Sequence, residues 1–235
     1  MPTIKELRSL SQSKRRDPIY TFMDYLAYYP AKILLYTSLT PNQITIMWIL
    51  GQIIAALFLI TGDHLIMTLA VLAFQCMFIL DCTDGIVARY RKKFSLNGIY
   101  LDYLGHYIAN PLLLVCYGIG VFKIERNIIF LLLGIGAAIV FLLNKAITLN
   151  PSFYSNPVQR EKIENALNKS LLKNQNQVLY TIFALFRLEY LGNLMFWGTL
   201  FGFAAETLMV YSLFLFLELI RKMVTQFRNN QSLDN

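Results

Sequence analysis

Charged side chains are scarce in this sequence of 235 residues. Aspartate, glutamate, lysine and arginine together make up 15% of the chain, whereas hydrophobic residues make up 56%. Ordinary soluble domains carry about 25% charged residues. The composition therefore excludes an ordinary soluble domain and predicts a membrane protein, and the length is that of one compact unit.

Cysteine is also rare. The three cysteines, Cys76, Cys82 and Cys116, have no paired spacing, and each lies in or beside an apolar run. This pattern excludes a disulfide framework and a zinc site. We expect the three side chains to be small, buried apolar groups.

We expect no cleaved signal sequence in the first forty residues, because Asp24, Pro30 and Lys32 interrupt the stretch after the first basic residues. Apolar residues recur there at helical spacing, together with tyrosines, which favour the membrane interface. These residues are Ile19, Phe22, Met23, Leu26 and Ile33, with Tyr25, Tyr28, Tyr29 and Tyr36. We expect residues 1–38 to form a cytosolic arm with an amphipathic helix on the cytosolic leaflet.

What the chain does contain is a series of apolar runs, most of them close to the ~20 residues of a membrane-spanning helix. The runs are 43–61, 65–80, 103–122, 127–144, 190–205 and 207–217. The predicted fold is all-α: an integral membrane bundle of six transmembrane helices over residues 39–225, with a tight outer turn at Glu206. Residues 149–177 are expected to form a polar cytosolic linker, and residues 226–235 a cytosolic tail.

Lysine and arginine predict the orientation of this bundle. They concentrate in the N-terminal arm, in residues 89–93, in the linker and near the C-terminus, all on one side of the predicted bundle. By the positive-inside rule, that side is the cytosol. Both termini and the segment around Asp81 are therefore expected to face the cytosol. Because the basic residues follow the loops and form no single stripe, the net charge of +7 does not indicate nucleic-acid binding.

Carboxylates cluster where the second apolar run ends. Asp81 and Asp84 are three residues apart and share a helix face, and Asp102 and His106 are four apart and share another. Bare carboxylates are costly at the edge of a membrane, so we expect them to hold a cation. Oxygen ligands suit Mg²⁺, which commonly binds through a few carboxylates and the phosphates of a substrate. The cluster therefore predicts a phosphate-bearing ligand.

The same residues form a long, gapped motif. Its fixed positions are Asp81, Asp84, Gly85, Ala88, Arg89, Gly98, Asp102 and His106. The motif resembles the signature of the CDP-alcohol phosphotransferase family at every fixed position but the last, where His106 replaces an aspartate. Pro41, Asn42 and Thr45 also resemble the Pro-Asn-x-x-Thr segment that precedes the signature in that family.

The resemblance implies an integral protein of the cytoplasmic (inner) membrane with six transmembrane helices, commonly a homodimer. It implies a site with two divalent ions, Mg²⁺ or Mn²⁺, that cleaves the diphosphate of a CDP-linked alcohol. The phosphoalcohol would pass to an acceptor hydroxyl on a lipid or a polyol, with release of CMP, in phospholipid or surface-glycan assembly.

Residue roles follow from the resemblance. Asp81, Asp84 and Asp102 would hold the ions, and Arg89 would bind the diphosphate through its guanidinium. The small residues Gly85, Ala88 and Gly98 would leave room for the nucleotide, which Asn42 would contact unless it serves as a helix cap. His106 would act as the general base or as a metal ligand, and its third interpretation is a loss of activity.

The sequence also bears on three other functions. An inactive family member acting as a membrane scaffold stays open. A polyprenyl-transferring enzyme is disfavoured, because enzymes of that kind look like they need two separate aspartate-rich motifs. This chain has one gapped motif. A cation transporter is disfavoured because no broken or inverted-repeat helices are visible. Finally, Gly118, Gly120, Gly134 and Gly136 are expected to allow close helix packing.

Overall fold

The structure is a computed structural model of the chain, and it describes all residues except 1, 11–17, 150–185, 187–192 and 235. The described residues form α-helices and one short 3₁₀ helix, with no strand among them. The all-α prediction is therefore confirmed for this part of the chain.

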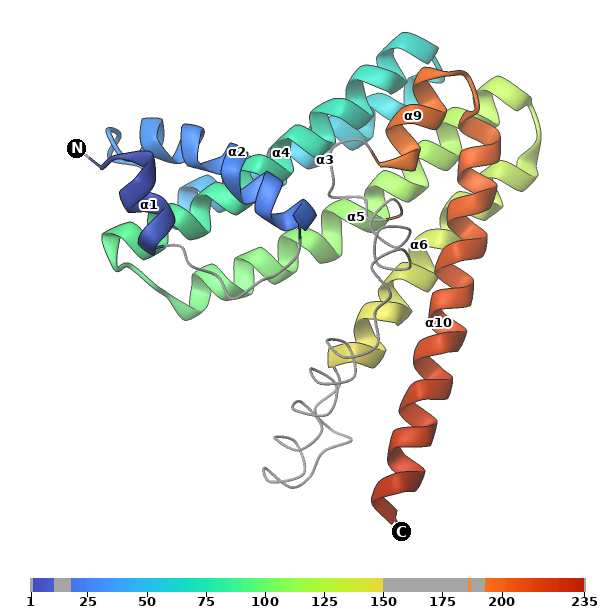
Figure 1. Cartoon of the computed structure of the whole chain (residues 1–235). Helices are drawn as coiled ribbons and strands as arrows, with labels where there is room; N and C mark the ends of the chain where they lie inside the picture. The colour runs from blue at the N-terminus through green and yellow to red at the C-terminus, as the bar shows by residue number, and fades with distance from the viewer. Residues whose placement is uncertain (1, 11–17, 150–185, 187–192, 235) are drawn as a thin grey trace.

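Four long helices form the body of the protein (Figure 1). They are α3 (Pro41–Phe58), continued by η1 (Leu59–Thr61), and α4 (His64–Arg91), α5 (Leu96–Glu125) and α6 (Ile128–Leu149). Within the described residues, these four are the helices long and apolar enough to cross a membrane. They confirm the first four predicted spans. Helix α3 packs on both α4 and α5, and α5 packs on α6.

Helices α4 and α5 are longer than the apolar runs that predicted them. Helix α4 has 28 residues, which at about 1.5 Å per residue makes it about 42 Å long, against about 30 Å of hydrocarbon core in a bilayer. The end of α4 with Asp81 and Arg89 therefore extends the membrane helix toward one surface. Helix α5 starts again at Leu96, and the hydroxyl of its N-cap residue Ser95 accepts the backbone N–H of Gly98.

Two glycines bring α5 and α6 into contact. A Cβ atom built on Gly118 would lie 2.8 Å from the Cα of Gly134, and the reverse holds for Gly134. A Cβ on Gly120 would strike the carbonyl oxygen of Leu59 in η1. The packing prediction is confirmed for these three glycines. A Cβ on Gly136 would meet no atom within 4 Å, so the described structure gives this glycine no packing role.

The N-terminal arm contains α1 (Ile4–Leu10) and α2 (Pro18–Leu34), which lie at the end of the bundle where α4 leads into α5 (Figure 1). Helix α2 buries Ala27 and Ala31 and packs on α4. Its exposed side carries Tyr25, Tyr29 and Ile33. The helical part of the prediction is thus confirmed, and the amphipathic character of α2 and its placement on the cytosolic leaflet stay predictions.

The C-terminal part of the described chain differs from its prediction in detail. The turn expected at Glu206 lies earlier, between α9 (Leu194–Leu200) and α10 (Ala204–Asp234). Gly202 takes φ +84° there, a left-handed conformation that glycine adopts at little cost, whereas Glu206 lies in the first turn of α10. Helix α10 also continues through residues 226–234, where we expected a tail.

The six-span count stays a prediction. Part of the fifth predicted span, 190–205, lies outside the described residues, and α9 has only 7 residues. Helix α10 packs along α6 (Figure 1). It contains charged residues such as Glu218 and Arg221, and it is not one of the four helices that are apolar enough to cross a membrane. All of the predicted linker 149–177 after Leu149 lies outside the described residues.

Candidate metal centre

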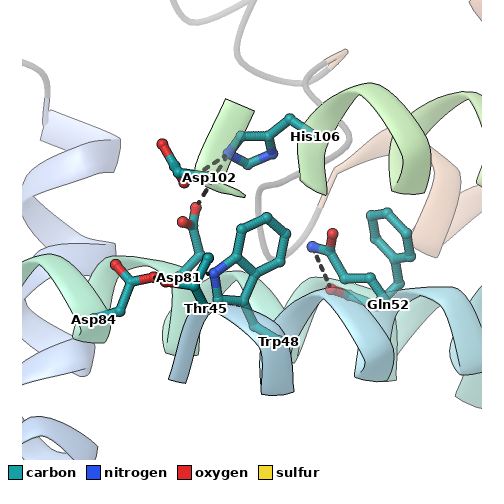
Figure 2. Close-up of polar contacts among 8 residues, drawn as sticks. Thr45, Trp48, Gln52, Asp81, Asp84, Asp102 and His106 are labelled. Carbon is teal, nitrogen blue, oxygen red and sulfur yellow. Dashed lines mark hydrogen bonds and ion pairs between the residues drawn. The ribbon is translucent and has the colours of Figure 1, made fainter. Parts of the chain in front are cut away.

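Three of the predicted metal ligands meet between α4 and α5 (Figure 2). The Nε2 atom of His106 lies 3.6 Å from Oδ2 of Asp81 and 3.7 Å from Oδ1 of Asp102. One ligand atom from each of the three residues lies within 4.8 Å of the other two. The structure therefore brings together a carboxylate of α4 with the two residues that were expected to share a face of α5.

The geometry of these three residues suits a shared cation. The separations of 3.6 and 3.7 Å are longer than direct hydrogen bonds. Two carboxylates face one imidazole, so the donor set is two oxygens and one nitrogen with a surplus of negative charge. Such a set fits a divalent ion, with carboxylate oxygen suited to Mg²⁺ or Mn²⁺ and imidazole nitrogen suited to transition metals.

Exposure increases across the cluster. The side chain of Asp81 is 12% exposed and that of His106 21%, whereas that of Asp102 is 43% exposed. Asp81 is thus the most buried of the three side chains, and Asp102 is the most exposed. A water-soluble ligand can reach the cluster from the Asp102 side.

Asp84 lies outside this group of three. Its Oδ2 atom accepts hydrogen bonds from the hydroxyl of Thr45, at 2.5 Å, and from the indole N–H of Trp48, at 3.1 Å (Figure 2). Both donors belong to α3. The carboxylate is therefore bound to α3 in this structure, and its role as a metal ligand stays a prediction.

Gly85 and Arg89 follow Asp81 at four-residue intervals on α4, so the three share one face of the helix. A Cβ on Gly85 would lie 3.3 Å from a terminal nitrogen of the Arg89 guanidinium. The missing side chain thus makes room for the guanidinium on this face. The neighbouring Ala88 is half-buried, and its carbonyl accepts the backbone N–H of Lys93 where the helix ends.

Asn42 connects the start of α3 to the start of α5. Its amide donates to the hydroxyl of Ser95 at 3.3 Å, and a Cβ on Gly98 would lie 2.8 Å from its carbonyl oxygen. The absence of a side chain at Gly98 therefore admits Asn42. Thr40 is the N-cap of α3, in a capping box with Gln43, so the capping role considered for Asn42 is wrong.

Sequence reasoning missed two residues that organise the site. Trp48 lies within the predicted apolar run 43–61, one helical turn after Thr45, and so faces the same neighbours as Thr45. Arg91 belongs to the basic residues 89–93, which predict the orientation of the bundle. Its guanidinium donates to the backbone carbonyls of the segment between α2 and α3, those of Leu34, Leu35, Thr37 and Leu39.

The groove between the halves of α3 and α4 that lie toward η1 has no such chemistry. It has a volume of about 340 Å³, and apolar residues such as Ile54, Phe58 and Leu69 line it. These residues lie toward η1, at the other end of α3 and α4 from Thr45 and Asp84. The polar cluster, and not this groove, is the candidate centre for chemistry.

Comparison with known proteins agrees with the motif. No curated protein sequence gives a significant match to this chain. The family model of the CDP-alcohol phosphatidyltransferases matches residues 38–204, which is more than half of the chain and includes the whole cluster. Membership implies an integral membrane transferase that takes a phosphoalcohol from a CDP-alcohol and uses a divalent metal. The chain belongs to the CDP-alcohol phosphatidyltransferase family.

Proposed function

We propose that this protein is an active phosphotransferase that moves a phosphoalcohol from a CDP-linked alcohol to the hydroxyl of a lipid or polyol acceptor and releases CMP. The pathway is phospholipid or surface-glycan assembly. The observation that carries the proposal is the convergence of Asp81, Asp102 and His106 at the end of two membrane helices. Carboxylates are retained in such a setting when they have a positively charged partner.

Asp81, Asp102 and His106 would hold one divalent ion, Mg²⁺ or Mn²⁺, and Asp84 would contribute to a second. A bound divalent ion neutralises charge that develops on the diphosphate and orients it for in-line displacement. The three carboxylates would hold the ions and thereby orient the diphosphate, and none of the four side chains would form a covalent bond with the substrate.

Arg89 is proposed to bind the diphosphate, because its guanidinium is always charged and can donate two parallel hydrogen bonds to a phosphate. It shares a helix face with Asp81. Four further residues lie near the helix ends around this cluster, where a nucleotide would pass: Asn42 on α3, Gly85 and Ala88 on α4, and Gly98 on α5. We propose that they line the nucleotide side of the site.

His106 has two possible tasks, and its Nε2 atom cannot perform both at once. As a base, Nε2 would take the proton of the acceptor hydroxyl while the new O–P bond forms and the bond to CMP breaks. As a ligand, Nε2 would hold the ion together with Asp81 and Asp102. The position of Nε2 between the two carboxylates favours the ligand role.

The site and both termini are proposed to face the cytosol, where nucleotide-activated substrates are made. The six-helix count and a homodimeric assembly remain part of this proposal, on the basis of the family resemblance. The donor is either CDP-diacylglycerol, with a soluble polyol as acceptor, or a CDP-linked small alcohol, with a lipid acceptor.

The test is CMP release by the purified full-length protein in lipid nanodiscs, with both donor classes, matching acceptors and Mg²⁺ or Mn²⁺. We expect turnover with one donor class, no turnover after chelation of the metal, and a loss of at least about a hundredfold in Asp81→Asn. Asp63→Asn is the matched control, since Asp63 caps the opposite end of α4 and asparagine caps equally well. Binding of CDP without CMP release from any donor would instead identify an inactive scaffold.

A further inference from the structure

Trp48 connects two parts of the cluster that belong to different helices. Its side chain is fully buried. The indole N–H donates to Asp84 of α4, and the indole ring packs against the imidazole of His106 of α5, with ring centroids 5.0 Å apart and an interplanar angle of 35° (Figure 2). A single α3 residue thus contacts a predicted metal ligand on each of the two neighbouring helices.

The contact between Trp48 and α5 depends on Gly105. A Cβ on Gly105 would lie 2.5 Å from the indole ring of Trp48 and 2.6 Å from the side chain of Ile49. Because glycine has no Cβ, α5 can approach α3 closely at this level. The next residue on α5 is His106, so its imidazole is brought onto the indole ring.

The orientation of His106 has no other evident support in the described part of the chain. Its Nε2 atom faces Asp81 and Asp102, whereas its Nδ1 atom is buried and has no hydrogen-bond partner among the described residues. Metal-binding histidines usually have the second nitrogen fixed by a carboxylate or a carbonyl. Here the indole ring occupies one side of the imidazole and limits its rotation.

We propose that Trp48 is a positioning residue with two separable effects. The indole ring holds the imidazole so that Nε2 points toward Asp81 and Asp102, and the indole N–H, together with the Thr45 hydroxyl, holds the Asp84 carboxylate on the α3 side. The inference rests on the proposed metal-dependent function, because it explains how the ligands of that centre are held. The inference goes beyond that function, because it assigns a role to a residue outside the motif.

Three variants separate the two effects. Trp48→Phe keeps an aromatic ring beneath His106 and removes the donor to Asp84, and Thr45→Val removes the other donor while leaving the ring in place. Trp48→Leu removes both the ring and the donor. Because the loss of a hydrogen bond to a charged group changes the equilibrium that holds this group in place by about a factor of ten, we expect kcat to fall about tenfold in the first two variants. The Mn²⁺ affinity of the site formed by Asp81, Asp102 and His106 should change little. In Trp48→Leu, we expect Mn²⁺ affinity to fall at least about tenfold as well.

Tryptophan fluorescence gives a readout that does not depend on turnover. The chain has two tryptophans, Trp48 and Trp197. Trp197 lies on α9 and is 46% exposed, so Trp197→Phe leaves Trp48 as the only reporter without touching the site. Paramagnetic Mn²⁺ bound by Asp81, Asp102 and His106 would quench this emission. We expect saturable quenching that Mg²⁺ reverses, that Asp81→Asn abolishes and that Asp63→Asn leaves intact.

The outcomes separate this inference from the proposed function. Saturable quenching of Trp48, with the kcat and affinity effects divided between the variants as described, supports it. Normal CMP release and Mn²⁺ binding in Trp48→Leu, or Mn²⁺ binding by calorimetry without quenching of Trp48, overturns the inference and leaves the phosphotransferase standing. Absence of both Mn²⁺ binding and CMP release in the parent protein overturns the two together.

Discussion

At the scale of single residues, the predicted departure of this chain from the signature that it resembles is the imidazole of His106. A carboxylate at this position would bring a third negative charge to the group formed with Asp81 and Asp102. The imidazole brings a softer nitrogen donor and less negative charge. The site should therefore bind hard Mg²⁺ less well than a site with three carboxylates, while keeping its affinity for Mn²⁺.

This reasoning predicts the effect of placing an aspartate at position 106. His106→Asp should raise Mg²⁺ affinity by about tenfold relative to Mn²⁺, because Mg²⁺ prefers oxygen ligands. His106→Ala should lower the affinity for both ions and remove most turnover. The measurements are Mg²⁺ and Mn²⁺ titrations of CMP release, together with direct Mn²⁺ binding by electron paramagnetic resonance.

The control for this pair is His64→Ala, which changes the only other histidine, at the opposite end of α4. It should leave both titrations unchanged. Full turnover in His106→Ala would remove His106 from the mechanism, whether as base or as ligand.

At the scale of helices, the apolar runs predicted the four helices that are long and apolar enough to cross a membrane, but not how far each helix extends. The run before Asp81 ends with Leu80, yet α4 continues to Arg91 because the polar residues after Leu80 also fit a helix and Lys92 closes it at φ 51°. Helical spacing correctly predicted that Asp102 and His106 share a face. It could not predict that Asp84 is bound by α3, since that depends on the packing of a third helix.

The crossing of α5 and α6 provides a prediction with a matched control on the same helix. Gly134→Ala should destabilise the protein by about 1–3 kcal/mol, because the new methyl group would overlap the backbone of Gly118. Gly136→Ala should be neutral or slightly stabilising, since nothing lies within 4 Å of its Cβ position and alanine favours helices. Thermal unfolding in one detergent measures both, and equal losses in the two variants would contradict the crossing.

At the scale of the whole molecule, composition and the apolar runs predicted a membrane bundle, and the four long helices and the family match agree with that prediction. The pairing of helices was beyond sequence reasoning, because apolar faces that pack on protein and those that face lipid have the same composition. Ile54 and Leu69 are exposed, whereas Ala55 and Ala70 beside them are buried. The hydrophobic surface left outside the core is what a bilayer would cover.

The orientation of the bundle leads to the last prediction. The loop after α4 carries Lys92 and Lys93, both exposed, whereas the loop before α4 carries Asp63. Because basic loops stay in the cytosol, a cysteine introduced at Lys93 should react with a membrane-impermeant maleimide only from the cytosolic side. A cysteine at Asn127, between α5 and α6, should react only from the outside. Both variants are made in a background without Cys76, Cys82 and Cys116 that still releases CMP. Labelling of residue 93 from outside would contradict the prediction, because it would place the metal cluster on the side of the membrane that cytosolic nucleotides do not reach.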